Sequence, residues 1–482
     1  MGDVYRTATK VVVWLGPAEN DSDLAMESLS GLGADLSTIP RPISAHELEE
    51  YGLPDENSPV WHAVGHLFRR QWFGRLWTFQ EAVLAAELIV VSGQKMADWK
   101  LIAKVAERLW VRGLWSVCVG YQRLTKHENG CIAAANVGWA RNQLIDSKEL
   151  PAIDLLDMVS HKTCLDPRDR VYAILGMTSF SFRNRIEISY SDGIDQHIWR
   201  TFIECAKACI EEGQVRILEL VAGRERISDL PSWCPDFRSN PADLALYSSH
   251  KIFSAGITRE SSSSKTTSIK TSRESDTLRA TGFRVDVVSE VVDGYFDWPN
   301  VQQGVQLRQR AQRFVEWESR RAALAQKTLS LPANTIPLAH MFTLSSSTQR
   351  WWFERHNASD SDLLKAYLHV LQIITNVALD AGTYLGKRTE LGVEVWHRIC
   401  EFNQGRRYFS TENGRLGLGP PEIQKGDTMC VFYGTETVML LRPTRNNPGD
   451  WYFVGDAFVH GLMELDETPQ SARGADEIFT IT

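Results

Sequence analysis

The chain has 482 residues, of which 43% are hydrophobic and 23% are charged, and its formal net charge is −8. This length predicts roughly two to four domains, because a single core rarely grows past about 250–300 residues. A net acidic chain with no long basic run predicts binding neither to nucleic acid nor to an anionic membrane surface. No apolar run approaches the ~20 residues of a membrane span. The start of the chain lacks the apolar core of a signal peptide, so we expect a cytoplasmic protein.

The eight cysteines are scattered, and none lies in a CxxC pair. Cys205 and Cys209 would share a helix face, but no nearby His or Cys completes a zinc set. His62 and His66 have the i,i+4 spacing that metals favour, but they lack a third ligand. We therefore expect reduced, partly buried thiols and no metal site.

The first hundred residues alternate between strand and helix patterns. Val11–Leu15 is a run of β-formers ended by Gly16-Pro17, and an apolar helical spacing follows from Leu24 to Gly31. This order predicts the strand–turn–helix unit of α/β folds. Gly16 is most simply a turn glycine, because no GxGxxG or Walker pattern follows it. A second helix is predicted at 61–68 and a second strand at 87–92.

Later segments change in character along the chain. Asp98 is a predicted cap of a helix, and 150–180, 194–212, 301–329 and 360–382 have helical patterns. The Ser/Thr-rich stretch 259–277 cannot bury much apolar surface. Short β-rich runs after Tyr408 predict an antiparallel meander. The predicted segments are an α/β part (1–95), a mainly helical region (96–257), a disordered loop (258–277), a mixed, mainly helical region (278–405) and a small antiparallel β module at the C-terminus (406–482).

Several sequence blocks occur in an order that resembles the fungal heterokaryon-incompatibility (HET) family. These blocks are VVVWLGPAENDSDLAMESL (11–29), WFGRLWTFQEAVLA (72–85), LDPRDRVYAILGM (165–177), LPSWCPDF (230–237), LRATGFRVDVV (278–288), GDTMCVFYG (426–434) and FVGDAFVHGLM (453–463). The resemblance implies self/non-self recognition that leads to programmed cell death in fungi. Its implied partners are further copies of the chain or other incompatibility proteins.

One part of the family pattern is missing. Family members usually open their domain with a strand that carries Ser-Tyr-x-Trp-Gly, and a second strand reads roughly Trp-Ile-Asp-x-Ile-Cys-Ile-Asn-Gln. Neither stretch occurs here, and the chain opens just before Trp14-Leu15-Gly16. The resemblance therefore predicts an N-terminally truncated copy: a fragment, a mispredicted gene product or a degenerate member.

The same resemblance implies a catalytic candidate. The HET domain has been likened to the TIR fold, so a partial TIR/flavodoxin-like sheet is expected in 1–95. Some TIR domains hydrolyse NAD with a Glu that follows a Trp on one helix, and Trp77 and Glu81 stand in that relation. A carboxylate can stabilise the oxocarbenium character that develops on the ribose. Glu81 would then be catalytic and Trp77 supporting, with NAD as a substrate and no bound cofactor.

Simpler roles remain open for these residues and for others. Glu81 is otherwise a solvated charge or the partner of Arg69 or Arg70, since Arg75 is six positions away. Four aromatic residues of the same block are expected in the core rather than against a nucleotide, namely Trp72, Phe73, Trp77 and Phe79.

Two further clusters have plain interpretations. Asp166, Arg168 and Asp169 are explained by helix capping and a surface ion pair. His161 and Cys164 could form a nucleophile pair, but no oxyanion-hole motif accompanies them. Three functions therefore remain: an NAD-hydrolysing enzyme, a non-enzymatic signalling adaptor, and a truncated inactive decoy of a full-length HET protein.

Overall fold

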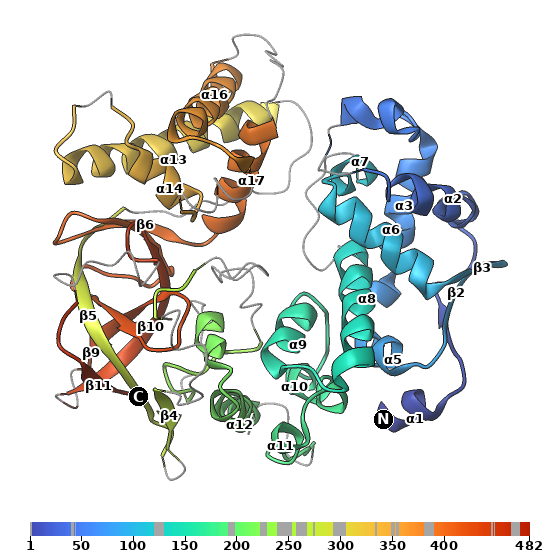
Figure 1. Cartoon of the computed structure of the whole chain (residues 1–482), viewed down its shortest axis with the longest axis horizontal. Helices are drawn as coiled ribbons and strands as arrows, with labels where there is room; N and C mark the ends of the chain where they lie inside the picture. Colours follow the sequence, from blue (N-terminus) through green and yellow to red (C-terminus); the bar gives the residue numbers. More distant parts are fainter. Residues whose placement is uncertain are drawn as a thin grey trace. The chain divides into compact units, whose positions relative to one another are not determined.

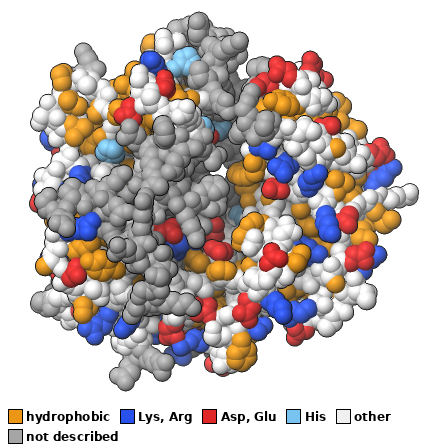
Figure 2. All heavy atoms as spheres, in the orientation of Figure 1, with side chains coloured by type: hydrophobic (Ala, Val, Ile, Leu, Met, Phe, Trp, Pro, Cys, Tyr) orange, Lys and Arg blue, Asp and Glu red, His pale blue; other side chains and the backbone are white. Residues whose placement is uncertain are grey.

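The computed structural model divides the chain into two compact units, Met1–Thr201 and Phe202–Thr482 (Figure 1). The structure describes residues 2–39, 43, 45–119, 130–190, 198–221, 229–238, 253–256, 268–272, 275–292, 305–332, 335–348, 352, 356–379, 390–444, 447, 449–463 and 473–482. Basic and acidic side chains are interspersed over the described surface in view in Figure 2.

Unit 1 contains a three-stranded sheet in the order β1-β2-β3. Strand β1 (Val11–Trp14) pairs in parallel with β2 (Leu88–Ser92), and β2 pairs antiparallel with β3 (Lys95–Asp98). Both strands predicted from the sequence in this part are therefore confirmed. Gly93 takes a φ of 56° in the tight turn between β2 and β3, a conformation that favours glycine.

Helices cover one face of this sheet. Val13, Leu88 and Val90 are buried there, against α2, α5 and α6. The helices of the unit are α1 (Gly2–Thr7), α2 (Ser22–Asp35), η1 (Ala45–Tyr51), α3 (Pro59–Phe68), α4 (Gln71–Gly74), α5 (Trp77–Leu84), α6 (Trp99–Val111), α7 (Trp115–Cys118), α8 (Gly130–Ser147), α9 (Ala152–Val159), α10 (Asp169–Tyr172), η3 (Leu175–Met177) and α11 (Phe180–Arg183).

Side-chain hydrogen bonds mark the start of one of these helices and the end of another. Asp98 caps α6 as predicted, because its carboxylate accepts the N–H of Lys100 at 2.7 Å. Arg141 of α8 caps the C-terminal end of α5, because its guanidinium donates to the carbonyls of Ala82 at 2.5 Å and Ala85 at 2.7 Å. A cation at a helix C-terminus satisfies carbonyls that have no partner within the helix.

Unit 2 is built on a closed ring of antiparallel strands. The ring follows the pairings β5-β6-β7-β10-β9-β8 and returns to β5, with β11 and β4 added on β5. Closure removes the exposed sheet edges within the ring. The strands are β4 (Ile269–Thr271), β5 (Leu278–Val291), β6 (Arg407–Thr411), β7 (Leu416–Gly419), β8 (Thr428–Phe432), β9 (Val438–Pro443), β10 (Asp450–Val459) and β11 (Glu477–Ile481).

The barrel recruits chain from outside the predicted β-rich module at 406–482. The β-like pattern of the sequence from Leu278 to Val288 becomes strand β5, at the start of the mixed, mainly helical segment 278–405. This strand supplies pairing edges to β6 and β8. Strand β4 lies near the C-terminal end of the predicted disordered loop 258–277. Its pairing with β5 makes this part of the predicted loop ordered. Residues 258–267, 273 and 274 of the same loop lie outside the described residues.

Helices gather at one end of the barrel, as Figure 1 shows. These helices are α13 (Val305–Thr328), α14 (Leu338–Leu344), α16 (Asp360–Ala378) and α17 (Glu390–Phe402). The chain also forms α12 (Ile198–Glu211, which begins in unit 1) and η4 (Val215–Leu220), outside this group. α13 packs on β6 and α14 on β7, and one apolar core joins these helices to the strands. The block LPSWCPDF packs elsewhere: buried Trp233 donates to the carbonyl of Asp276 at 2.9 Å.

Candidate functional site

Glu81 lies in a contact between two helices. It is half-buried on α5, which packs against α1, and the hydroxyl of Tyr5 on α1 hydrogen-bonds its carboxylate. Burial of this hydroxyl and the negative charge of Glu81 raise the pKa of Tyr5, and the positive charge of Arg75 lowers it. No pattern in the sequence points to Tyr5, because its proximity to Glu81 comes only from the packing of the two helices.

Arg70 pairs with a residue other than Glu81. Its side chain is 9% exposed and donates to the carboxylate and, at 2.8 Å, to the carbonyl of Glu19. The suggestion that Arg70 pairs with Glu81 is therefore wrong, because the Arg70 guanidinium donates its hydrogen bonds to Glu19 instead. Gly16, with a φ of 108°, makes the turn that presents Glu19, as the sequence predicts. The pair joins the block at 11–29, which contains Glu19, to the turn just before the block at 72–85.

Trp77 faces a different cluster. Its indole N–H donates to one oxygen of Asp169 at 3.0 Å, and the hydroxyl of Tyr190 donates to the other oxygen at 2.6 Å. The guanidinium of Arg168 lies 5.3 Å from the Tyr190 ring centre and is hydrogen-bonded to Asp166. These contacts connect the block at 72–85 with the block at 165–177. Trp77 therefore has its own structural partner, Asp169, rather than Glu81.

The pair of Arg168 and Asp166 is more buried than the sequence suggests. The two side chains are only 4% and 15% exposed, so this is not a surface ion pair. One carboxylate oxygen of Asp166 also accepts the backbone N–H of Arg168 at 2.9 Å. The predicted N-cap role of Asp166 is wrong, because α10 begins only at Asp169 and has Arg168 as its N-cap. Hydrogen bonding from Arg168 lowers the pKa of Asp166. The pair is thus a rigid support for the turn before α10.

The remaining sequence candidates show no catalytic arrangement. Phe73 and Phe79 are core residues as predicted, at 2% and 0% exposed, whereas Trp72 and Trp77 are half-buried. Burial raises the pKa of Cys164, which disfavours the thiolate that a nucleophile needs. Among the residues that the structure describes, no three His, Cys, Asp or Glu side chains are grouped to hold a metal ion.

Lys162 was missed by the sequence reasoning. Its side chain is 1% exposed, and its ammonium donates to the carbonyl of Phe73 at 2.7 Å with the Phe79 ring centre 6.0 Å away. Burial lowers the pKa of Lys162 to about 7. A lysine is almost never fully buried without a charged partner. The local sequence from Ser160 to Cys164 contains no signal that predicts a buried lysine.

Among the described residues of unit 2, buried polar side chains gather around Arg406 and around His340. Arg406 donates to the carboxylate of Asp456 at 2.6 Å and to its carbonyl at 3.0 Å, with side chains 2% and 1% exposed. Glu219 of η4 lies near this pair, and its burial, together with the charge of Asp456, raises its pKa to about 8. His340 bridges the hydroxyl of Tyr408 at 2.8 Å and the carboxylate of Glu318 at 3.3 Å.

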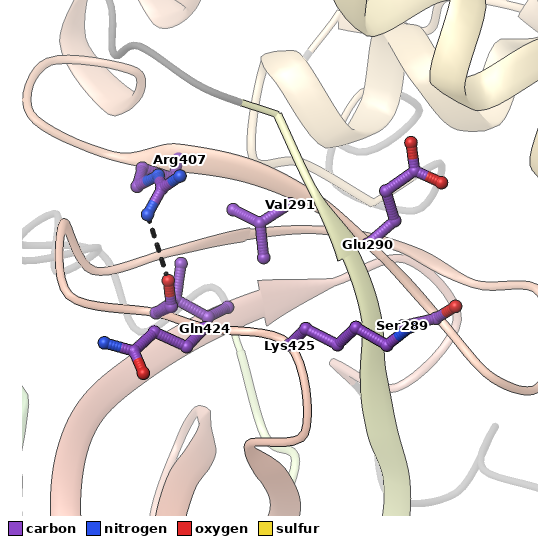
Figure 3. Close-up of a pocket in the computed structure, with 7 residues that line it drawn as sticks. Ser289, Glu290, Val291, Arg407, Gln424 and Lys425 are labelled. Carbon is purple, nitrogen blue, oxygen red and sulfur yellow. Dashed lines mark hydrogen bonds between the residues drawn. The ribbon is translucent and has the colours of Figure 1, made fainter.

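The barrel surface also carries an open pocket of about 410 Å³. Figure 3 shows Arg407 and Glu290 on opposite sides of Val291, with Gln424 and Lys425 below. Arg407 donates to the carbonyl of Ile423 at 3.1 Å, and Glu290 pairs with Lys327. The lining is of mixed charge and offers no buried nucleophile, so it suggests no defined chemistry.

Two segments of the chain are similar to known protein families. Residues 1–81 match the family model of the heterokaryon incompatibility protein (HET), and residues 375–478 match that of the Het-6 β-barrel domain. The chain is similar to heterokaryon incompatibility protein 6, OR allele, of Neurospora crassa, with 24% identity over 98% of this chain and 78% of the relative. No solved structure matches the chain.

The matched regions coincide with the features described above. The HET match spans β1 and ends at Glu81, and the barrel match includes β6 to β10. Within the described residues, no helix has the length and apolar character needed to cross a membrane. The chain is therefore similar to fungal heterokaryon incompatibility proteins, through a HET match at residues 1–81 and a Het-6 β-barrel match at residues 375–478.

Proposed function

We propose that this chain acts in heterokaryon incompatibility, as a non-enzymatic signalling adaptor for self/non-self recognition that leads to programmed cell death. The observation that carries the incompatibility role is the similarity to the Neurospora incompatibility protein, which extends over 98% of the chain. Both matched regions belong to the same class of protein, so the role does not rest on one short motif.

The surroundings of Glu81 favour an adaptor over an enzyme. Its carboxylate is held by Tyr5 within a helix contact. Open α/β sheets bind ligands at the carboxyl ends of their strands, and here the end of β1 is occupied by the pair of Arg70 and Glu19. A substrate at Glu81 would have to displace Tyr5 and would lie away from the usual ligand position.

Hydrolysis of NAD is the second candidate. It is favoured by the spacing of Trp77 and Glu81 and by the partial exposure of the Glu81 side chain. The parallel pairing of β1 and β2, with α2 following β1, supports a partial TIR/flavodoxin-like relation for unit 1. In this mechanism the Glu81 carboxylate would stabilise positive charge on the ribose as the nicotinamide leaves.

An assay of nicotinamide release separates the two candidates. We expect the concentrated 482-residue chain to release no more nicotinamide from NAD than the Glu81→Gln variant does. Glu87→Gln is the matched control, because Glu87 is 56% exposed and pairs with Lys10 rather than with Tyr5. Release that is abolished by Glu81→Gln and retained by Glu87→Gln would establish the enzyme instead.

The same variant reports on the structural role of Glu81. Glu81→Gln keeps a hydrogen-bond acceptor and removes the negative charge, so the pKa of Tyr5 should fall toward its ordinary value. The absorbance titration of the variant, after subtraction of the same titration with Tyr5→Phe, measures this change. An unchanged titration would show that the Tyr5–Glu81 contact is absent in solution.

The decoy interpretation makes a different prediction. A decoy would bind a full-length HET protein and suppress killing when the two are coexpressed. The adaptor should instead add to killing.

A further inference from the structure

The short helix η4 follows α12 in the chain and packs on strand β10 of the barrel. A glycine separates it from α12, because Gly213 has a φ of 78° and its N–H donates to the carbonyl of Ile210 at 2.9 Å. Glycine in this conformation commonly ends a helix. After η4, the carbonyl of Val221 lies so close to Gly455 that an added Cβ would come within 3.1 Å of it. η4 is therefore an element of its own that contacts the barrel closely.

One buried carboxyl group lies in the contact between η4 and the barrel. Glu219 is 1% exposed, and the hydroxyl of Thr437 donates to its carboxyl oxygen at 3.3 Å. Among the described residues, no lysine or arginine forms an ion pair with Glu219. An ionised carboxylate without an ionic partner is costly in such surroundings, so the group holds a proton instead.

The charges around Glu219 also cancel when it is neutral. Asp456 on β10 is paired with Arg406 at 2.6 Å, so this pair has no net charge. Arg216 of η4 and Glu436, just before β9, act on Glu219 with opposite signs. Ionised Glu219 would therefore add a negative charge that no neighbour compensates. Its pKa of about 8 agrees with this charge balance.

We propose that η4 docks on β10 through a protonated Glu219 side chain, and that loss of this proton releases η4 from the barrel. The docked state binds the proton, whereas a Glu219 side chain released into water loses it above about pH 4.5. Rising pH therefore favours release up to about pH 8, and acidification favours docking.

This release would make the attachment of the connecting segment to the barrel depend on cellular pH. The boundary between unit 1 and unit 2 falls within α12, and η4 follows after residues 212–214. The inference rests on the proposed function only for its biological role, because release is measured on the purified chain. Failure to observe release would overturn the inference and leave the role in incompatibility standing.

Amide hydrogen exchange of the 482-residue chain at pH 6 and at pH 8 tests the proposal. The N–H groups of Ile217 and Val221 report on η4, since they donate to the carbonyls of Gln214 and Leu218. After correction for intrinsic exchange rates, their protection should decrease roughly 30- to 100-fold between the two pH values. In Glu219→Gln the carboxamide stays neutral, so the protection should be equal at both pH values.

Glu212→Gln is the matched control, because Glu212 is exposed between α12 and η4. The protection of η4 in this variant should decrease as it does in the wild-type chain. Glu219→Met is also neutral over this pH range, and it provides the test if circular dichroism shows that Glu219→Gln does not fold. A decrease that persists in the neutral variants, or that is absent from the wild-type chain, would overturn the proposal.

Urea distinguishes release of η4 from unfolding of the whole barrel. The N–H of Val288 donates to the carbonyl of Asp427 at 2.9 Å within the barrel, so it exchanges when the barrel unfolds. We expect Val221 to exchange about tenfold faster than Val288 or more, and without dependence on urea below about 1 M, because a local opening exposes little surface. Equal protection and equal urea dependence of the two amides would show that η4 is not released separately.

Discussion

Substitution of Asp456 by alanine should lower the free energy of unfolding of the barrel by about 3–5 kcal/mol, the usual effect of breaking a buried ion pair. The guanidinium of Arg406 would keep its bond to the carbonyl of residue 456 and lose its charged partner while 2% exposed. Desolvation of an uncompensated charge, rather than the loss of one hydrogen bond, accounts for the size of the effect.

Hydrogen exchange of the β6 and β10 amides measures this change in unit 2 alone. The matched control is Glu477→Ala, which breaks the bidentate pair with Arg284 in the same barrel. Those side chains are 50% and 34% exposed, so we expect a loss of about 0–1 kcal/mol. Equal losses in the two variants would show that the pair of Arg406 and Asp456 is hydrated in solution.

Glu219 adds a pH dependence of known sign to the same cluster. Its pKa is raised to about 8 when folded, so between about pH 4.5 and 8 the folded state binds the extra proton. Stability of the barrel should therefore fall as pH rises through this window. Asp456→Ala removes a negative charge near Glu219, so the stability of the barrel should decrease less as the pH rises in this variant.

Substitution of Lys162 by methionine should raise the stability of unit 1 at pH 7 by roughly 1–3 kcal/mol. A buried charge without an ionic partner is costly, and an apolar side chain of similar volume is often more stable in its place. Part of the gain is offset, because the carbonyl of Phe73 loses its hydrogen bond.

The wild-type chain should also show a pH dependence that the methionine variant lacks. The folded pKa of Lys162 is lowered from 10.5 to about 7. Between these values the unfolded chain binds more protons than the folded chain, so stability rises with pH, by roughly 4 kcal/mol over the window. Parallel urea titrations of both proteins measure the difference in slope.

The control for this prediction is Lys100→Met. Lys100 is exposed on α6, so its substitution should change stability by less than about 0.5 kcal/mol and leave the pH slope intact. A slope that persists in Lys162→Met would mean that water reaches Lys162 in the folded state.

Elements with a clear local pattern could be predicted from the sequence. The run Val11–Leu15 before Gly16-Pro17 became β1, and the cap at Asp98 began α6. Both depend on residues within a few positions of one another. The role of β5 in the barrel could not be predicted, because its partners β6 and β8 follow only after more than a hundred intervening residues.

The surroundings of Glu81 were beyond prediction for the same physical reason. The contact between Tyr5 and Glu81 depends on how α1 packs on α5. The ion pair between Arg70 and Glu19 depends on the turn at Gly16. Charge pairing across a fold is decided by burial and geometry, neither of which a linear pattern contains. Lys162 shows this most clearly, because its local sequence resembles a solvated helix end.

The most direct test of the adaptor mechanism is killing in a fungal tester strain, scored by uptake of a vital dye. The Glu81→Gln chain should kill as well as the wild-type chain, because the proposed function uses no catalytic carboxylate. Glu87→Gln, expressed to the same level, serves as the control. Killing that is lost in Glu81→Gln and kept in Glu87→Gln would contradict a non-enzymatic adaptor.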